Sequence, residues 1–554
     1  MISADLHTDS RIVVWADTPG DKTFLKKAIR RMPFSKKKPD DSYILSIYDF
    51  CLLKVKLNQL GARGKKMSLR LKEKLDRMNY SIEFPGLPDL KRPLLNFHED
   101  GFNFMVPREA AILGDQMGSG KTSQAIASAQ YLISKGKVKS FFCIVKSTAV
   151  DHWANQFDIM YGDKASYQII RHYNTKKRFE QYSNKANFYI ISLDTYKVDI
   201  QKIFSKIDWY SVGIILDEAH KIKNQDTKRA GSCYMVSGMV PYRWALTGIP
   251  IDGKLESLYG IMKFLDIQFF VDYHHFEKFH LITDMYGNPV GYKNIDELRL
   301  KLKPMMIRRT KEEVLPDMPP KTYNTIWIDL SKKEKKLYKD LKNQCIELST
   351  EELNEKVNEN IDLVFGIFAQ SFVDAPILLD PEMNFPSTKM KELADLLGDM
   401  TEHSKVVVFT KYARMCHILH EWLPWKSIMY TGEMDYKQKE KAKMDFLLEE
   451  DNRLFIMDTA GAESIDLHGT EVDGEWINGA DYLIFFDSLW NPTMNEQIED
   501  RIHRVGKDVP VNIIYLRTKG TIEEKIHKVN EERSELFYRV IDEKLTEEDI
   551  RNLL

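Results

Sequence analysis

The amino-acid sequence predicts an α/β fold with two parallel-sheet lobes, helical insertions and a small N-terminal α+β domain. A chain of 554 residues is too long for a single hydrophobic core. Short apolar runs occur in two groups, separated by helix-like segments, which is typical of parallel sheets covered on both faces. The stretch GDQMGSGKT (114–122) directly follows one of these runs, and DEAHKIKN (217–224) follows another.

Residues 1–85 lie outside both groups of apolar runs and do not show their alternation with helix-like segments. They end at FPGLP, which is typical of a linker. Between Lys22 and Arg77 there are 17 Lys or Arg against 5 Asp or Glu, although the net charge of the whole chain is −2. A basic block beside an acidic remainder indicates a module that contacts a polyanion. We therefore predict a small basic domain that recognises DNA substrates. Helix faces whose lysines are merely solvated are the open alternative.

The first lobe is expected over residues 86–320 and the second over residues 391–530. The apolar runs of the first lobe are AAIL (110–113), FFCIV (141–145), FYIISL (188–193), VGIIL (212–216) and RWAL (243–246). Those of the second lobe are KVVVF (405–409), SIMY (427–430), RLFIM (453–457), DYLIFF (481–486) and VNIIYL (511–516). Residues 321–390 are predicted as a helical insertion and linker, and residues 531–554 as a helical tail.

Composition bounds the compartment and excludes some kinds of site. The five cysteines are scattered and form no CxxC pair, which predicts reduced thiols and no zinc site. No run approaches the ~18 apolar residues of a membrane-spanning helix, and the start MISADLHTDSR has no secretory pattern. We expect a monomer with no membrane partner. Its expected compartment is the cytoplasm of a prokaryotic or phage-infected cell, or the nucleus of a eukaryote.

Two motifs of the first lobe predict a site for ATP and Mg²⁺. GDQMGSGKT lies between an apolar run and a helix-like segment, so backbone N–H groups and a helix N-terminus can cradle phosphates. Asp217 lies at the carboxyl end of a buried strand, where it would coordinate Mg²⁺, and Glu218 would orient and deprotonate the attacking water. The expected phosphate-site residues are Gly118, Gly120, Lys121, Thr122 and Ser123, with the Thr122 hydroxyl also on the metal.

A third motif, EDRIHR (499–504), lies in the other lobe. Arg501 and Arg504 are three residues apart on a presumed helix and therefore on one face. If they face the phosphate cradle, they supply the positive charge that phosphoryl transfer needs in the transition state. The site would then be complete only when the two lobes close, which is typical of a motor.

The motifs together resemble a known family. DEAHKIKN, WALTGIP (244–250), LKPMMIRRTKEEVLPDMPPK (302–321) and WNPTMNEQIEDRIHRVGK (490–507) are similar to the Swi/Snf-type branch of helicase superfamily 2, in family order over roughly residues 90–530. The resemblance implies two RecA-like lobes that move along double-stranded DNA with ATP, usually without unwinding it. It implies ATPase roles for Lys121, Thr122, Asp217 and Glu218, γ-phosphate sensing by Gln497, Arg501 and Arg504, and coupling through Thr247.

The same resemblance implies a set of DNA contacts, mostly to phosphates, which position the protein without reading sequence. The motifs are KSTAVDHW (146–153), ISLDTY (191–196), KVVVFTKY (405–412), YTGEM (430–434) and DTAGAESIDL (458–467). The implied contact residues are Lys146, Ser147, Thr148, Thr195, Thr410, Lys411, Thr431, Gly432, Thr459, Trp490 and Asn491.

Several positions depart from the expected patterns. Asp115 stands where the strict phosphate loop has glycine, and Gln116 where the family usually has Glu. His98 stands where the adenine-recognising segment usually has Gln, so it is the candidate base contact. DTAGAESIDL is more acidic than the usual Gly-rich version, which predicts altered coupling between ATP hydrolysis and DNA.

We therefore expect a DNA-dependent ATPase that translocates on double-stranded DNA, including branched or forked DNA. It would remodel DNA or protein–DNA structures in repair, recombination or replication-fork processing. One alternative is a strand-separating DNA or RNA helicase. Another is an ATP-binding scaffold with little turnover, which intact Lys121, Glu218 and Arg504 argue against.

Overall fold

The structure is a computed structural model of the whole chain, and it divides into two compact units. The first unit comprises Met1–Val314 and Leu536–Leu554, and the second comprises Leu315–Glu535. Residues 2–542 are described, except 9–10, 30–31, 33–35, 60–64, 73–74, 76–81, 88, 271, 351–365, 463–464, 473 and 505. Among these residues no helix is long and apolar enough to cross a membrane.

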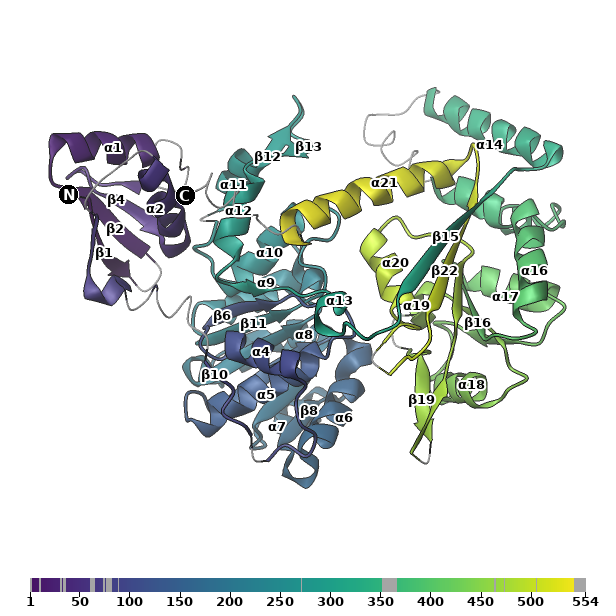
Figure 1. Ribbon diagram of the computed structural model, residues 1–554, viewed down its shortest axis with the longest axis horizontal. Helices are drawn as coiled ribbons and strands as arrows, with labels where there is room; N and C mark the ends of the chain where they lie inside the picture. The colour runs from purple at the N-terminus through teal and green to yellow at the C-terminus, as the bar shows by residue number, and fades with distance from the viewer. Residues whose placement is uncertain are drawn as a thin grey trace. The chain divides into compact units, whose positions relative to one another are not determined.

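The N-terminal domain of the first unit is a small α+β sandwich (Figure 1). Its sheet has the order β3-β4-β2-β1-β5, formed by β1 (Ile2–Thr8), β2 (Arg11–Ala16), β3 (Lys36–Lys37), β4 (Tyr43–Ser46) and β5 (Lys65–Met67). Side chains alternate in β2, so that Ile12, Val14 and Ala16 are buried. Helices α1 (Pro19–Ile29) and α2 (Ile47–Gln59) also contribute to its core. The predicted α+β fold of this region is confirmed.

The first lobe is built on a seven-stranded parallel sheet of order β14-β6-β11-β10-β7-β9-β8. The strands are β6 (Ala110–Leu113), β7 (Ser140–Val145), β8 (Tyr167–Ile170), β9 (Phe188–Ser192), β10 (Val212–Asp217), β11 (Tyr242–Leu246) and β14 (Met306–Ile307). Five of these match the predicted runs. The two others, β8 and β14, lie at the edges of the sheet, where less burial leaves a weaker apolar signal.

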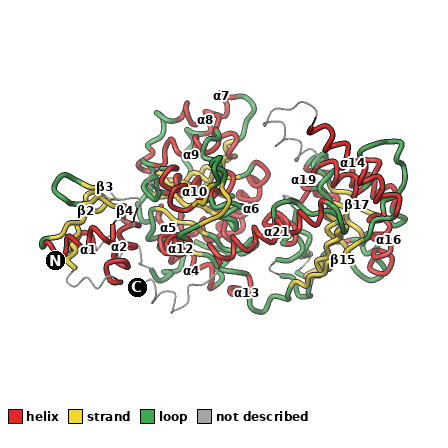
Figure 2. The backbone as a smooth tube through the Cα atoms, turned by 90° about the horizontal axis from the view of Figure 1, so that it is seen from above, coloured by secondary structure: helices red, strands yellow, loops and turns green. Residues whose placement is uncertain are grey.

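Helices cover both faces of this sheet (Figure 2). One apolar core joins the sheet to α4 (Asn96–Met105), α5 (Lys121–Ser134) and α6 (Val150–Tyr161). The opposite core joins it to α8 (Leu193–Ile203), α9 (Lys228–Ser237) and α10 (Glu256–Leu265). The short helix α7 (Thr175–Gln181) lies between β8 and β9 in the chain. Because both faces are buried, the strands need no polar alternation, which explains their continuous apolar runs.

An insertion after α10 carries α11 (Tyr273–His280), the hairpin β12 (Leu281–Thr283) and β13 (Pro289–Tyr292), and α12 (Ile295–Leu302). The N-terminal domain shares its apolar core with this insertion. At their contact the Lys301 ammonium lies 2.7 Å from an Asp49 carboxylate oxygen, and both side chains are fully buried. Lys301 also donates to the Phe269 carbonyl at 2.9 Å, and the Tyr48 hydroxyl donates to Asp266. The domain is therefore fastened to the first lobe by buried polar contacts.

The second lobe has a six-stranded parallel sheet of order β15-β22-β21-β16-β18-β17. Its strands are β15 (Lys321–Ile328), β16 (Val406–Phe409), β17 (Ser427–Tyr430), β18 (Leu454–Met457), β21 (Tyr482–Phe485) and β22 (Val511–Thr518). Val407 and Phe409 pack toward α18 (Tyr436–Leu448), whereas Val406 and Val408 pack toward α16 (Thr388–Met400) and α17 (Ala413–Trp422). Two parallel-sheet lobes confirm the predicted fold class.

The segment predicted as a helical insertion, residues 321–390, begins with strand β15 rather than with a helix. The sequence KTYNTIWI pairs over its whole length with β22, and most of its side chains are partly or fully exposed. Such a half-exposed edge strand has no continuous apolar run and is therefore easily missed. Helices α14 (Lys332–Thr350) and α16 follow, while part of the predicted helical pattern lies outside the described residues.

Candidate nucleotide and DNA site

The phosphate loop connects β6 to α5 in the first lobe. Gly118 and Gly120 have φ angles of +78° and +71°, which only glycine adopts at little cost. Gly120 caps α5 without a side-chain cap, so the first N–H groups of the helix remain available to an anion. Thr122 and Ser123 lie in the first turn of this helix. The loop therefore has the backbone shape that a phosphate group requires.

The Lys121 ammonium lies over this loop, donating to the Asp115 carbonyl at 2.8 Å and to the Gln116 carbonyl at 3.2 Å. Burial lowers the pKa of Lys121, while the negative charges of Glu218, Asp115 and Asp217 oppose that shift. The structure thus brings Lys121 together with the acidic pair at the end of β10. A triphosphate would replace the two carbonyl oxygens as acceptors for the ammonium.

Asp217 ends β10, and one of its carboxylate oxygens accepts a hydrogen bond from the Trp153 indole N–H at 2.8 Å. Burial, reinforced by the Glu218 charge, raises the pKa of Asp217 to about 6, and the Trp153 bond acts against the rise. A divalent cation would offset the crowding of two carboxylates. The oxygen atoms of Asp217 and Thr122 therefore fit Mg²⁺, which binds oxygen ligands.

Glu218 has left-handed backbone angles, φ 48° and ψ 51°, which are uncommon for a residue other than glycine. His220 lies between Glu218 and Thr247, with its Nδ1 atom 3.2 Å from a Glu218 oxygen and 3.4 Å from the Thr247 hydroxyl. Thr247 follows β11, is fully buried, and accepts the Ile249 N–H at 3.0 Å. His220, which the sequence analysis did not single out, connects the two residues expected to hydrolyse ATP and to couple hydrolysis to motion.

His98 packs against the phosphate loop from α4. The Leu95 N–H donates to Nδ1, so Nε2 carries the proton and donates to the Ser119 carbonyl at 3.0 Å. Burial lowers the pKa of His98 to about 4, so the ring is neutral at pH 7. A side chain at Gly120 would collide with this ring at 2.4 Å. His98 therefore supports the loop, and its contact with a base remains an expectation.

The departure at Asp115 has a structural explanation. Asp115 is fully buried, and the guanidinium group of Arg309 donates to both of its oxygens, at 3.1 and 2.5 Å. The side-chain oxygen of Gln116 accepts a hydrogen bond from the Lys311 N–H at 2.8 Å. The segment MIRRTK (306–311) is thus hydrogen-bonded to the phosphate loop through Asp115 and Gln116. Sequence reasoning used this segment for its resemblance and gave no role to Arg309.

The DNA-contact candidates of the first lobe follow the carboxyl ends of its strands. Lys146 follows β7, while Ser147 and Thr148 are exposed in the short helix that comes next. Thr195 lies in the first turn of α8, and its N–H and hydroxyl both contact the hydroxyl of Ser192. The exposed side chains of Ser147 and Thr148 at this edge of the sheet suit phosphate contacts.

The candidates of the second lobe gather in the same way after β16, β17 and β18. The Thr459 hydroxyl donates to the Lys411 carbonyl at 3.2 Å, and the Gly432 N–H points to Asp458. Thr410 and Thr431, however, are buried, with exposed fractions of 0% and 1%. The Thr410 hydroxyl donates to Asp487 at 2.9 Å, so it does not face solvent. Both threonine side chains are thus buried in this structure, and their contact with DNA stays a prediction.

Asp487 belongs to a buried cluster that sequence reasoning missed. It accepts the Lys411 N–H at 2.6 Å, and Lys389 nearby is ion-paired to Asp374 at 3.0 Å and to Glu523. Burial raises the pKa of Asp487, Asp374 and Glu523, and the Lys389 charge acts against each rise. The cluster fixes the start of the 410–411 loop to distant parts of the second lobe.

The prediction that EDRIHR (499–504) is helical is wrong in part. Helix α20 (Pro492–Glu499) includes Gln497 but ends before Arg501 and Arg504. Beyond the end of the helix, the Arg501 carbonyl accepts the Leu467 N–H at 2.7 Å. The two arginines still converge, because both guanidinium groups approach the carboxylate of Asp466. Before them, Asn491 caps α20 through a bond from the Thr493 N–H, and the Trp490 carbonyl accepts from Arg533.

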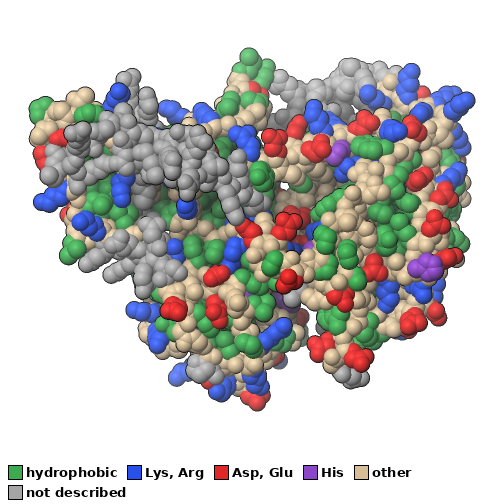
Figure 3. Space-filling view, in the orientation of Figure 1, with side chains coloured by type: hydrophobic (Ala, Val, Ile, Leu, Met, Phe, Trp, Pro, Cys, Tyr) green, Lys and Arg blue, Asp and Glu red, His purple; other side chains and the backbone are tan. Residues whose placement is uncertain are grey.

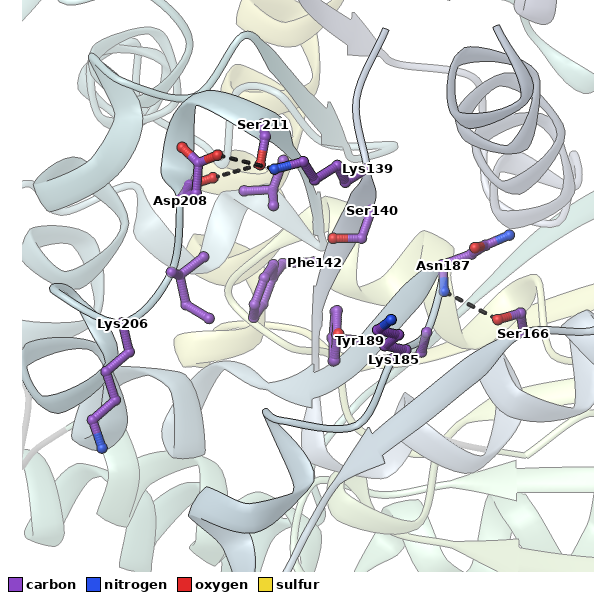
Figure 4. A pocket seen from close by; sticks show the side chains of 13 residues that line it. Lys139, Ser140, Phe142, Ser166, Lys185, Asn187, Tyr189, Lys206, Asp208 and Ser211 are labelled. Atoms are coloured by element: carbon purple, nitrogen blue, oxygen red, sulfur yellow. Dashed lines mark hydrogen bonds and ion pairs between the residues drawn. The ribbon is translucent and has the colours of Figure 1, made fainter. Parts of the chain in front are cut away.

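A separate cavity of about 480 Å³ opens at the amino ends of β7, β9 and β10, opposite the phosphate loop (Figure 4). Lys139 is paired with Asp208, and the Asn187 N–H donates to the Ser166 hydroxyl. No residue of the predicted nucleotide site lines this cavity. On the face in Figure 3, basic and acidic side chains are interspersed, so surface charge there does not mark a DNA path.

Comparisons with known proteins agree with this geometry. The family of the SNF2-related domain matches residues 97–373, and the helicase conserved C-terminal domain matches residues 388–506. The chain belongs to the SNF2 family. Both matches cover the loops that carry the candidate residues, so this SNF2-family chain has the paired lobes of a helicase-like ATPase.

Several curated relatives match most of the chain. A human SWI/SNF-related regulator of chromatin, subfamily A member 1, is 25% identical over 85% of this chain and 45% of its own length. A putative ATP-dependent helicase/translocase of Bacillus subtilis is 25% identical over 82% of this chain and 49% of its own. The chain thus spans about half the length of these relatives. A solved Sulfolobus solfataricus SWI2/SNF2 ATPase core in complex with dsDNA is 22% identical, with a TM-score of 0.39, over 85% of this chain and 99% of that one.

Proposed function

We propose that this chain is a DNA-dependent ATPase that translocates on double-stranded DNA and remodels DNA or protein–DNA structures. The observation that carries the proposal is the grouping of Lys121, Asp217 and Glu218 at one sheet edge of an SNF2-family lobe. The second lobe offers two arginines that converge on Asp466, together with loop residues such as Lys411 and Thr459 that are partly exposed. Repair, recombination or replication-fork processing is the setting we propose.

In this proposal the residues divide the work of hydrolysis. Lys121 and the N–H groups of the loop hold the outer phosphates, and Thr122 with Asp217 holds Mg²⁺, which would neutralise the developing charge. Glu218 orients the attacking water and takes its proton. Gln497, Arg501 and Arg504 of the second lobe stabilise the charge on the transferred phosphoryl group, so closure of the lobes completes the site.

The DNA partner follows from the same closure. Residues of both lobes would contact phosphates along the duplex. They are Lys146, Ser147, Thr148 and Thr195 of the first lobe, and Lys411, Gly432, Thr459, Trp490 and Asn491 of the second. A track that holds both lobes in register would favour closure and thereby hydrolysis. Phosphate contacts do not depend on sequence, which suits movement along DNA.

The test is an ATPase assay on a panel of duplex, forked and four-way-junction DNA, beside triplex-displacement and strand-displacement assays. We expect ATPase stimulation by duplex DNA and displacement of a third strand without separation of the duplex. Equal rates with and without duplex DNA at low to moderate salt would refute the proposal. Stimulation by single strands or RNA only would favour the strand-separating alternative instead.

A further inference from the structure

The acidic run after β18 has a consequence for the two arginines of the second lobe. Asp466 lies shortly after the short helix α19 (Thr459–Ala462), with one oxygen 2.7 Å from Arg504 and 3.7 Å from Arg501. The backbone bond from the Leu467 N–H to the Arg501 carbonyl fixes this approach. Both arginines are thus held by one carboxylate of their own lobe.

The contact of Asp466 with the two arginines is an ion pair that leaves hydrogen-bonding groups of the described chain without partners. Arg504 is ion-paired with Asp466 Oδ1 but does not form an aligned hydrogen bond with it. That buried oxygen has no hydrogen-bond partner among the described residues. The Arg504 Nε and Gln497 Nε2 atoms are likewise buried donors without an acceptor in the part of the chain that the structure describes. Two guanidinium groups therefore approach this one carboxylate, and Arg504 keeps a buried donor that no described residue accepts. Guanidinium groups that meet at one carboxylate can also bind a more highly charged anion such as a phosphate.

Asp466 is ionised in this setting. Burial raises its pKa, but the charges of Arg504 and Arg501 outweigh burial and hold the pKa below its ordinary value. About a third of the carboxylate side chain is exposed, with an exposed fraction of 32%. Water can therefore solvate the carboxylate when an arginine leaves, so the contact can be exchanged.

We propose that Asp466 is an internal counter-ion that occupies Arg504 and Arg501 in the resting protein and yields them to the γ-phosphate of ATP. This inference rests on the proposed role of the two arginines. A contact made in the ground state and weakened in the transition state slows the reaction. Asp466 therefore keeps hydrolysis slow until DNA-bound lobes close. Because it competes with the γ-phosphate for the arginines, it also reduces the preference for nucleoside triphosphates over diphosphates.

The test is Asp466→Asn in the full chain, which keeps the shape of the side chain and removes its charge. We expect the ATPase rate without DNA to rise about fivefold or more, the DNA-stimulated kcat to stay within about twofold, and the stimulation ratio to fall. The affinity for the non-hydrolysable analogue AMP-PNP, relative to ADP, should rise in parallel. This binding readout is independent of DNA stimulation. A wild-type chain without stimulation would refute the translocase proposal while leaving the effect of Asp466 measurable.

Matched variants separate the counter-ion role from general damage. Asp481→Asn removes a carboxylate of almost equal exposure, 31%, that pairs with Lys507 at 3.0 Å, and it should leave the basal rate unchanged. Asp466→Glu keeps the charge and should stay near wild type. Arg504→Ala combined with Asp466→Asn should be as slow as Arg504→Ala alone.

Three results would overturn the inference. The first is a basal rate in Asp466→Asn that is unchanged or reduced, with the melting temperature of wild type. The second is an equal rise in Asp481→Asn or Asp466→Glu. The third is a rise that persists when Arg504 is removed.

Discussion

At the scale of single residues, the two carboxylates at the end of β10 have different proposed functions, which can be tested separately. We propose Asp217, the last residue of β10, for the metal, and Glu218, which follows it with left-handed backbone angles, for the attacking water. Glu218→Gln keeps the size of the side chain but cannot take a proton. We expect near-normal ATP affinity and a kcat lower by about 10²–10⁴-fold. Fluorescent-nucleotide binding and phosphate release measure the two properties, and wild-type turnover would contradict the assignment.

The raised pKa of Asp217 predicts a pH dependence with a defined sign. A carboxyl group whose pKa is about 6 loses its charge progressively as the pH falls through that value, and Mg²⁺ needs the ionised form, so kcat/KM should fall as the pH drops through about 6. Trp153→Phe removes the hydrogen bond that lowers this pKa, so the acid limb should move to higher pH.

Trp244→Phe is the matched control for that pH profile. Trp244 is also a fully buried indole of the first lobe, but its N–H donates to the Arg108 carbonyl rather than to Asp217. It should leave the acid limb where it is in the wild type. A limb that stays in place in Trp153→Phe, or that moves equally in both variants, would contradict the proposed cause.

At the scale of elements, the MIRRTK segment holds the phosphate loop in place through hydrogen bonds. Arg309→Ala leaves the fully buried Asp115 without its bidentate partner, which costs about 3–5 kcal/mol of unfolding free energy. In a lobe of this size the melting temperature falls by roughly 2–4 °C per kcal/mol. We expect a clear loss of thermal stability, measured by calorimetry, together with weaker nucleotide binding.

The double variant Asp115→Asn with Arg309→Met distinguishes an uncompensated charge from lost packing. It removes both charges of the pair, so it should be more stable than Arg309→Ala alone. If the double variant is less stable than the single one, the ion pair is not the reason for the loss.

Much of this organisation could be predicted from local patterns, because strands and phosphate loops are encoded by neighbouring residues. The apolar runs before Asp217 and Gly114 placed both motifs correctly at strand ends. Contacts between distant residues could not be read in this way. Arg309 meets Asp115 across 194 positions, and Asp466 meets Arg504 from a loop that precedes α20 in the chain. The half-exposed edge strand β15 was missed because its stability comes from its partner β22.

At the scale of the whole molecule, the N-terminal domain combines a firm attachment with an exposed basic helix. Its attachment uses Lys301 and Asp49, which are buried, so these charges are not available to DNA. In contrast, Lys22, Lys26 and Lys27 of α1 are exposed. A domain that is fixed to the first lobe would offer these lysines in a constant position, which suits recognition of a particular DNA shape.

Removing these three charges in the full chain tests that role without disturbing the attachment. Each lysine–phosphate contact contributes about −0.9 to the slope of log affinity against log salt. Replacing Lys22, Lys26 and Lys27 by Gln should therefore flatten the slope by up to about 2.7. The variant should also lose preference for forked over linear duplex, measured by DNA binding across a salt series.

The matched control replaces Lys135, Lys137 and Lys139, which are exposed on the first lobe near the amino ends of its strands. Its slope and ranking of substrates should stay those of the wild type, because these lysines lie at the edge opposite the phosphate loop and the DNA-contact candidates. If the α1 variant keeps the wild-type slope and ranking, its lysines are merely solvated and the domain does not select DNA.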